Sequence, residues 1–296
     1  MPAEQPPRTF SVIGAGVIGV AFATLLQQRG YACRGVASRT LAQAQRAVAR
    51  IGAGLASSAP AEVARGCRYV FITTPDAAIA AVCGDLAAAQ AVGPGQIVLH
   101  SSGAFNRGLL EAAARAGALT ASLHPLQSFA DLEQALRRLP GTSFCIEADA
   151  AALPEVRAIV RALGGEELEV ASERKALYHA AACVLSNSLA ALIDAGLRLF
   201  AAAGIPRQRA WPAVLPLIEG TLGNIGTVGL PQALTGPVAR GDLETIRLHL
   251  RALATEEPKL GEAYRDLARL IIPLALAKGT LDHAGAEALR TLLDQP

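Results

Sequence analysis

The stretch TFSVIGAGVIG, residues 9–19, decides how the rest of the chain is interpreted. Its first six residues form a short apolar run that is typical of a buried strand. Residues 17–30 then have the pattern of a helix that ends at Gly30. The chain therefore passes from a strand through glycines directly into a helix.

Three glycines in this stretch, Gly14, Gly16 and Gly19, have the spacing G-x-G-x-x-G. The first permits a tight turn, the second lets the backbone approach a pyrophosphate, and the third lets the helix pack closely on the strand. The free N–H groups at the helix start then face the anion. We therefore predict a dinucleotide clamp, with a plain β-turn-α corner as the alternative. Its expected cofactor-binding residues are Gly14, Ala15, Gly16, Val17, Ile18 and Gly19.

The residues that end the second strand-like run bear on the choice of cofactor. An acidic residue there would bind a ribose 2′-hydroxyl and indicate NAD, but residues 36–40 read VASRT and carry no carboxylate. Arg39 can pair with a 2′-phosphate, and Ser38 and Thr40 can donate hydrogen bonds to it. NADP(H) is therefore preferred over NAD(H). The alternative is a solvated Arg39 beside a helix N-cap.

The order of elements predicts the fold class. Strand-like runs alternate with helix-like segments up to about residue 168, which implies βαβ units and a doubly wound, mostly parallel sheet of the Rossmann type. From residue 172 onward almost everything is helical in pattern. We predict a dinucleotide-binding α/β domain over 1–168 and an all-helical domain for substrate binding and dimerisation over 169–296.

Composition argues against several classes of function. The chain has 27 basic and 25 acidic residues and only 4% aromatic residues, which gives no footprint for nucleic acid or an anionic membrane. Its five cysteines form no CxxC pair and no metal-binding pattern, so we expect no metal and a cytoplasmic protein. Residues 176–193 are uncharged but include polar side chains, which favours a buried core helix over a membrane span.

Polar residues follow three of the predicted strands: 73–76 (TTPD), 100–103 (HSSG) and 124–125 (HP). Ligands bind past the carboxyl ends of the strands in open α/β sheets, so these groups are expected to converge at one edge. Each also has a plain alternative, since Asp76 can cap a helix, the serines can form a turn, and His124 can be a core histidine. The cofactor-binding residues expected from this edge are Thr73, Thr74, Pro75 and Ser101, with Thr74 and Pro75 beside the nicotinamide ribose.

The helical half adds a polar stripe and a glycine-rich loop. Lys175, His179 and Ser186 fall within about 40° of one another on a helical wheel, with Asn187 beside them. Burying such groups without purpose is costly, so we expect the stripe to face a cleft. Residues 220–242 are rich in Gly, Thr and Pro; Thr235, Gly236 and Arg240 could close over a substrate, or the segment could be an interhelix loop capped by Asp242.

These motifs resemble a family of Rossmann-like oxidoreductases whose C-terminal half is a domain of unknown function. Its cousins are pyrroline-5-carboxylate reductase, ketopantoate reductase and the 6-phosphogluconate and β-hydroxyacid dehydrogenases. The resemblance is carried by VIGAGVIG, ITTPD, HSSGA, SLHPLQSF, KALYHAA and LTGPVARGD. It implies a 6-phosphogluconate-dehydrogenase-like helical domain that builds a homodimer.

The resemblance also implies residue roles. Lys175 matches the lysine of the β-hydroxyacid dehydrogenases, although His179 stands where their asparagine would be. Ser102 and Gly103 match the strand-end serine and glycine of that superfamily. The pair His124-Pro125 is similar to the His-Pro of prephenate dehydrogenases, where the histidine contacts the substrate.

The expected function is therefore an NADP(H)-dependent oxidoreductase that transfers a hydride to or from a small carbonyl or hydroxyacid substrate. Its alternatives are an imine reductase and a non-catalytic NADP(H)-binding sensor. The expected catalytic residues are Lys175, His179 and Ser102. The expected substrate-binding residues are His124, Gly103, Ser186, Asn187, Thr235 and Arg240. Partners other than the small-molecule substrate and a second copy of the chain are not expected.

Overall fold

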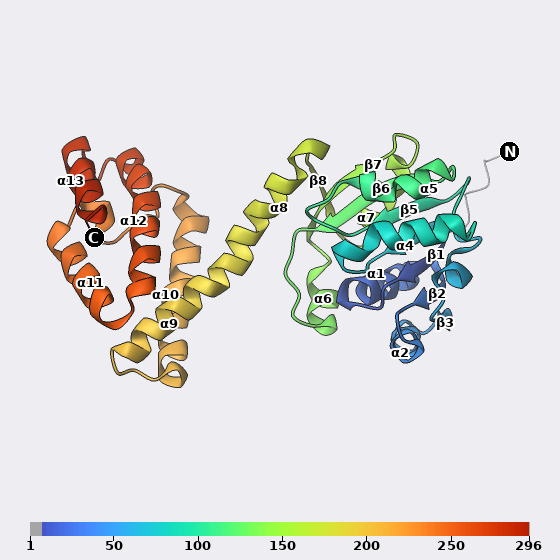
Figure 1. Cartoon of the computed structure of the whole chain (residues 1–296), viewed down its shortest axis with the longest axis horizontal. Coiled ribbons are helices and arrows are strands. Elements are labelled where there is room, and N and C mark those ends of the chain that lie inside the picture. Colours follow the sequence, from blue (N-terminus) through green and yellow to red (C-terminus); the bar gives the residue numbers. More distant parts are fainter. Residues whose placement is uncertain (1–7, 296) are drawn as a thin grey trace. The chain divides into compact units, whose positions relative to one another are not determined.

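The computed structural model describes residues 8–295, and the chain divides into two compact units, 1–187 and 188–296. The first unit is α/β and the second is helical (Figure 1). The predicted domain boundary at 168/169 stays a prediction. The unit boundary lies further along the chain, inside a helical stretch, because the first turns of that stretch pack on the sheet.

Eight strands form one sheet in the order β3-β2-β1-β4-β5-β6-β7-β8. All neighbouring strands are parallel except β6 and β7, so the predicted doubly wound, mostly parallel sheet is confirmed. The strands are β1 Thr9–Ile13, β2 Ala32–Ala37, β3 Leu55–Ser57, β4 Tyr69–Ile72, β5 Ile97–His100, β6 Leu119–Pro125, β7 Ser143–Ala148 and β8 Glu166–Glu169. The strand order reverses between β1 and β4, which is where such sheets bind ligands.

Helices cover both faces of this sheet. They are α1 Val17–Gln28, α2 Leu41–Ile51, α3 Pro60–Ala64, α4 Asp76–Ala88, α5 Glu111–Arg115, α6 Leu132–Arg138 and α7 Leu153–Ala162, and α8 Lys175–Cys183 follows the last strand. A short 3-10 helix, Arg107–Leu110, precedes α5, and another, Ser172–Arg174, precedes α8.

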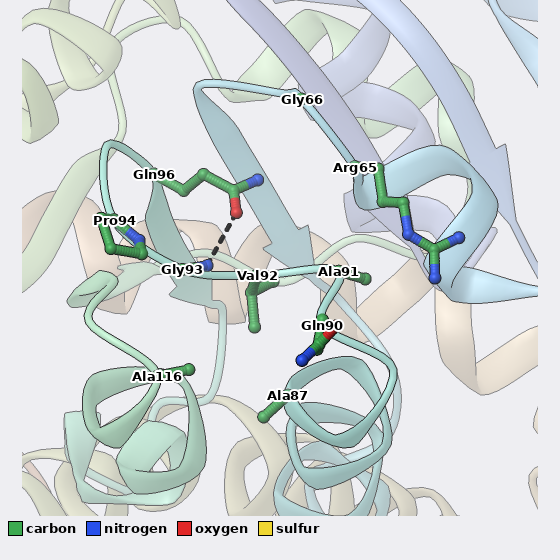
Figure 2. Close-up of a pocket in the computed structure, with 10 residues that line it drawn as sticks. All are labelled: Arg65, Gly66, Ala87, Gln90, Ala91, Val92, Gly93, Pro94, Gln96 and Ala116. Carbon is green, nitrogen blue, oxygen red and sulfur yellow. Dashed lines mark hydrogen bonds between the residues drawn. The ribbon is translucent and has the colours of Figure 1, made fainter.

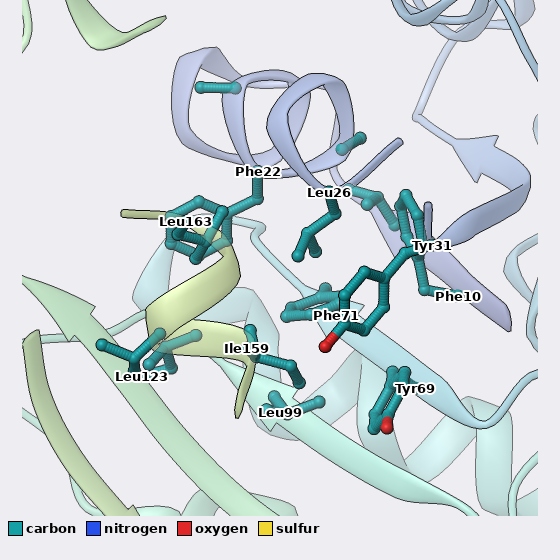
Figure 3. Packing of buried hydrophobic residues seen from close by; sticks show 14 of the residues in the cluster. Phe10, Phe22, Leu26, Tyr31, Tyr69, Phe71, Leu99, Leu123, Ile159 and Leu163 are labelled. Atoms are coloured by element: carbon teal, nitrogen blue, oxygen red, sulfur yellow. The ribbon is translucent and has the colours of Figure 1, made fainter. Parts of the chain in front are cut away.

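The strand sequences place apolar residues on both faces in alternation. Phe10 and Phe71 pack with α1 and α7, whereas Ile13, Val70 and Ile72 pack with α3 and α4. Successive side chains of a strand point to opposite faces, so a continuous apolar run is what a strand buried on both sides requires. Figure 3 shows the first of these two cores, in which the Phe10 and Phe71 rings meet edge to face at 6.1 Å.

The second unit has its own core, built from α11, α12 and α13. Its helices are α9 Leu189–Ala202, α10 Arg207–Val228, α11 Leu243–Glu256, α12 Pro258–Lys278 and α13 His283–Leu293. A π-helical segment, Val184–Ser188, joins α8 to α9. The expected loop over 220–242 is only partly correct, because α10 continues to Val228; the rest is irregular apart from a 3-10 turn at Val238–Arg240, and Asp242 caps α11.

The expectation of a buried core helix over 176–193 is wrong for the single chain. Among the described residues, the helical stretch Ser172–Ala202 is long and apolar enough to cross a membrane. In its most apolar 18-residue segment, 6% is buried. Leu177, Val184 and Leu185 are 65%, 62% and 76% exposed. The sequence pattern distinguishes an apolar helix from a polar one. It does not show whether an apolar side chain is buried within its own chain or exposed on the surface.

Candidate functional site

The glycine loop has the geometry that a dinucleotide clamp needs. Gly14 has φ +112°, and a Cβ built on it would lie 2.7 Å from the Thr73 carbonyl carbon. A Cβ on Gly19 would lie 2.4 Å from the Gly14 carbonyl oxygen. A Cβ on Gly16 would meet nothing within 4 Å, so this exposed position is the one that leaves room for a ligand. The first and third glycines therefore serve packing, and the second opens the backbone to the outside.

The residues after β2 have the arrangement of the alternative interpretation of the VASRT stretch. Thr40 is the N-cap of α2, where its hydroxyl accepts from the Gln43 amide, and the Ser38 hydroxyl donates to the Gln43 side chain at 2.9 Å. Arg39 lies between them and is exposed. The capping alternative is thus realised by Thr40, and the pairing of Arg39 with a 2′-phosphate stays a prediction.

At the end of β4, two threonines have different environments. Thr73 donates through Oγ1 to the Gly14 carbonyl at 2.8 Å, which ties β4 to the glycine loop. The Oγ1 of Thr74 is buried and has no hydrogen-bond partner within residues 8–295. A buried hydroxyl without a hydrogen-bond partner costs folding free energy, so Thr74 Oγ1 is a candidate to hydrogen-bond a ligand. Pro75 beside it is exposed and is the N-cap residue of α4.

A cavity of about 250 Å³ lies at this edge of the first unit. It is lined by Val17, Ile18, Ser101, His124, Pro125, Gln127 and Phe129. The cavity thus brings the start of α1, which follows the glycines, together with the ends of β5 and β6. Residues predicted to bind a cofactor and a residue predicted to bind a substrate share one hollow.

Ser102 is held by a network inside the loop after β5. Its hydroxyl donates to Asp76 Oδ2 at 2.8 Å and accepts from the Phe105 amide at 3.2 Å. Asp76 therefore binds Ser102 and makes no capping hydrogen bond to α4. His100 accepts from the Ser102 amide through Nδ1 at 3.1 Å, which leaves Nε2 to donate to the Asn106 carbonyl at 3.0 Å. Burial, with the nearby Lys175 adding to it, lowers the pKa of His100 to about 4.

Lys175 is almost completely enclosed. The side chain is 1% exposed, and its Nζ donates to the Ser102 carbonyl at 3.2 Å and to the Ser122 hydroxyl. Burial lowers the pKa of Lys175, whereas Cys145, Glu147 and Asp76 act to raise it. The expected cleft-facing stripe is therefore only partly formed: Lys175 faces the interior of the first unit, and Ser186 and Asn187 are exposed.

His124 is the centre of a group of rings. Its Nδ1 lies 2.9 Å from the Tyr178 hydroxyl, and its ring meets those of Tyr178 and His179 edge to face at 5.7 and 5.8 Å. Burial and the Lys175 charge lower the pKa of His124 to about 4. Gly103 makes this packing possible, because a Cβ there would lie 2.5 Å from His179 Cδ2 and 2.7 Å from His124 Nε2.

Two further predicted residues belong to the second unit. Thr235 is exposed in the irregular segment after α10, and Arg240 is exposed at the end of the 3-10 turn. Their binding roles stay predictions, as do the roles of the other predicted site residues.

Sequence reasoning missed Ser122 and assigned no role to Tyr178. Ser122 stands two positions before His124 on β6, so both side chains are on the same face of that strand. That spacing could have identified Ser122 as a member of the group. Tyr178 adjoins His179 on α8, but its contact with His124 depends on how α8 packs on the sheet.

A second hollow of about 660 Å³ opens at the opposite edge, near the amino ends of β4 and β5 (Figure 2). Gln96 lies beside it and accepts from the Gly93 amide at 2.8 Å. Its lining residues do not include the predicted site residues.

Comparisons with known proteins match two parts of the chain. A model of a Rossmann-like domain matches residues 3–125, and a model of a domain of unknown function, DUF2520, matches residues 142–271. No curated protein matches the sequence.

Several solved structures have a similar fold over most of the chain. A protein of Bacteroides fragilis, provisionally assigned as an NADP oxidoreductase, has a TM-score of 0.74 at 23% identity and covers 90% of this chain and 98% of its own. A Thermotoga maritima protein has a TM-score of 0.72 at 25% identity, with 91% and 99% covered. A reductive aminase of Aspergillus terreus, in complex with NADPH and ethyl-5-oxohexanoate, has a TM-score of 0.67 at 16% identity, with 94% and 97% covered.

A Streptomyces aurantiacus imine reductase also matches, with a TM-score of 0.58 at 19% identity over 96% of this chain and 93% of its own. The expected fold class is therefore confirmed as the 6-phosphogluconate-dehydrogenase-like fold of the imine reductases. The chain combines an N-terminal Rossmann-like domain with a C-terminal DUF2520 domain.

Proposed function

We propose that this protein is an NADP(H)-dependent oxidoreductase that transfers a hydride to or from a small carbonyl or hydroxyacid compound. The observation that carries the proposal is the cavity in which Val17 and Ile18 of the glycine loop and helix face the imidazole of His124. Hydride transfer needs a nicotinamide that is bound beside a group able to donate or accept a proton. This cavity joins the helix start that is expected to bind the cofactor with an imidazole that could transfer the proton.

The residues present fit the cofactor. Gly16 leaves its side of the loop open, and Thr74 supplies a buried hydroxyl without a partner in the described chain. When bound, NADP(H) supplies the hydride at the nicotinamide C4. The protein would hold the pyrophosphate on the amides at the start of α1 and the nicotinamide ribose beside Thr74 and Pro75.

The preference for NADP(H) rests on Arg39. The side chain is exposed after β2, where the 2′ position of an adenosine ribose lies in this type of fold. One solved structure with a similar fold contains NADPH, and another is provisionally assigned as an NADP oxidoreductase, which supports the same cofactor.

Calorimetric titration with NADPH and NADH tests this proposal. The wild-type protein should bind NADPH at micromolar concentration and NADH much more weakly. Arg39→Ala should weaken NADPH binding on the order of 10–100-fold, because a charge-assisted hydrogen bond to the 2′-phosphate is lost, and leave NADH binding unchanged. Arg46→Ala, at an exposed arginine of α2, is the matched control and should change neither affinity. No binding of either cofactor would contradict the proposal.

Reduction of imines is the second candidate, because a reductive aminase and imine reductases have the same fold. NADPH oxidation with a cyclic imine and with a matched cyclic ketone separates the two. Faster turnover of the imine would favour the second candidate. Binding of NADPH without turnover of either would favour a sensor.

We further propose that a second copy of the chain covers the apolar helix around Leu185. The helix carries exposed leucine and valine side chains on a protein whose charge is nearly balanced. Ser186, Asn187 and Ser188 interrupt it with polar groups that a protein partner tolerates better than lipid. The resemblance to homodimeric relatives supports the same partner.

A further inference from the structure

The two ring nitrogens of His124 have different surroundings. Nδ1 lies 2.9 Å from the Tyr178 hydroxyl. Nε2 packs against Gly103, where a Cβ would lie 2.7 Å from it, and it has no hydrogen-bond partner in the described part of the chain. The same ring lines the cavity with Val17 and Ser101. One nitrogen is thus hydrogen-bonded within the protein, and the other has no such partner on a ring that lines the cavity.

The protonation of this pair follows from its environment. Burial and the Lys175 charge lower the pKa of His124 to about 4, so the ring is neutral near pH 7. Burial raises the pKa of Tyr178, so its phenol keeps its proton. The tautomer of a neutral histidine is set by the hydrogen bond at its other nitrogen. A phenol that donates to Nδ1 leaves the proton of the ring on Nε2.

The other candidates for proton transfer are less well placed. Lys175 is 1% exposed, and its Nζ donates hydrogen bonds to the Ser102 carbonyl and the Ser122 hydroxyl. His179 meets His124 at the ring edge, and its Nδ1 lies 3.8 Å from the Cys183 sulfur. The titratable groups around His124 are then Lys175, Tyr178 and His179 of α8, His100 of β5 and Cys145 of β7, and of these Tyr178 hydrogen-bonds to the His124 ring.

We propose that His124 is the proton donor to the substrate's carbonyl oxygen and that Tyr178 is its positioning residue. This inference rests on the proposed oxidoreductase function. As a hydride reaches the carbonyl carbon, the C=O π electrons move to oxygen, which takes the proton from His124 Nε2. The ring takes a proton at Nδ1 from Tyr178 Oη, and the phenolate that remains is reprotonated by water. The reverse sequence oxidises the alcohol.

The direction of this relay is favourable. An alkoxide is a much stronger base than a phenolate, so the proton moves downhill even from a phenol whose pKa burial has raised. Lys175 is a buried cation close enough to lower the pKa of His124, and it favours the negative charge that develops on the oxygens. Lys175 thus acts through its field and does not touch the substrate.

Nitrogen NMR of the imidazole rings tests the proposal without a substrate. In the wild-type protein with NADPH bound, His124 should be a neutral Nε2–H tautomer near pH 7. Tyr178→Phe removes only the hydroxyl and should convert His124 to a mixture of tautomers. The matched control is Tyr264→Phe, because Tyr264 Oη lies 2.8 Å from His249 Nδ1 with the same edge-to-face geometry outside the site. The control should leave the His124 signals unchanged.

A kinetic measurement accompanies the spectrum, with ethyl 5-oxohexanoate as the carbonyl probe. Tyr178→Phe should lower kcat on the order of 100-fold with little change in KM, since general acid catalysis contributes about 10²–10⁴-fold. Tyr264→Phe should keep the wild-type kcat.

The outcomes separate this proposal from the proposed function. An Nδ1–H tautomer, a charged His124 at pH 7, or a Tyr178→Phe protein with the wild-type tautomer and kcat would overturn the role of His124. If NADPH still binds in that case, the oxidoreductase proposal stands and only the proton donor changes. Failure to bind NADPH would remove the basis of both.

Discussion

The imidazole of His100 is 1% exposed and uses both ring nitrogens to hold its own loop. It accepts from the Ser102 amide and donates to the Asn106 carbonyl, so it fixes the segment that carries Ser102 and Gly103. A charged ring could not accept from that amide. The shape of the loop therefore depends on His100 remaining neutral.

This dependence predicts how stability changes with pH. The pKa of His100 is about 4 in the folded protein and about 6.5 in the unfolded chain. Between these values the unfolded chain binds more protons, so the contribution is fully present above pH 6.5 and is lost as pH falls toward 4. The loss amounts to about 3 kcal/mol for this group.

Urea unfolding between pH 4.5 and 7.5 measures it. His100→Asn should be less stable at pH 7 and should show a flatter dependence on pH. His283→Asn, at an exposed position, serves as the control. An equally steep pH dependence in His100→Asn would contradict the assignment.

At the scale of elements, Glu155 joins α7 to β4. Its carboxylate accepts from Arg68 Nε at 3.0 Å and from the Tyr69 hydroxyl at 2.7 Å. These hydrogen bonds, with Arg68 first, lower the pKa of Glu155. These hydrogen bonds are half-buried. They join side chains that are 86 or 87 positions apart in the sequence, so they fix α7 on the sheet.

Glu155→Gln keeps the shape of the side chain and removes its charge. We expect the free energy of unfolding to fall by about 1–3 kcal/mol, the usual effect of losing a charged hydrogen-bond partner away from bulk water. Glu133→Gln removes one member of an exposed pair with Arg50 and should cost less than about 1 kcal/mol. Chemical unfolding of both variants at pH 7 compares them, and equal effects would contradict the structural role of Glu155.

The sequence predicted the regular elements better than the irregular ones. The glycine spacing and the alternating runs identified β1, α1 and β4, because both faces of these strands are buried and each helix must pack on them. It missed the two edge strands, because β3 has only three residues and β8 has a single apolar residue, the leucine of EELE. It also ended α10 too early, since the local preference of Gly and Thr against helix is weak and tertiary structure overrides it.

The site was predictable in part for the same reason. The strand ends had to meet at one edge, so the sequence could group Thr74, Ser102 and His124. It could not place the Lys175 ammonium against Ser122 or the Tyr178 hydroxyl against His124, because both contacts depend on how α8 docks on the sheet.

At the scale of the whole molecule, the proposed dimer can be tested by light scattering after size-exclusion chromatography. The wild-type protein should have about twice the chain mass of 30.5 kDa. Leu185→Glu places a charge at a 76% exposed leucine of the apolar helix and should give monomers. Leu55→Glu, at a 54% exposed leucine of β3, is the control and should stay dimeric. A monomeric wild type, or one that floats with lipid vesicles, would contradict the proposal.

The glycine loop is tied to three strands before any ligand arrives. The Gly14 amide donates to the Ala37 carbonyl, the Thr73 amide donates to the Ile13 carbonyl, and the Thr73 hydroxyl donates to the Gly14 carbonyl, each at 2.8 Å. A ligand that binds there has little backbone left to order, so it retains the part of its interaction energy that a floppy loop would consume as lost entropy. At a given affinity such a preordered loop binds and releases its ligand quickly, which suits the proposed cofactor, because that cofactor would leave after every turnover.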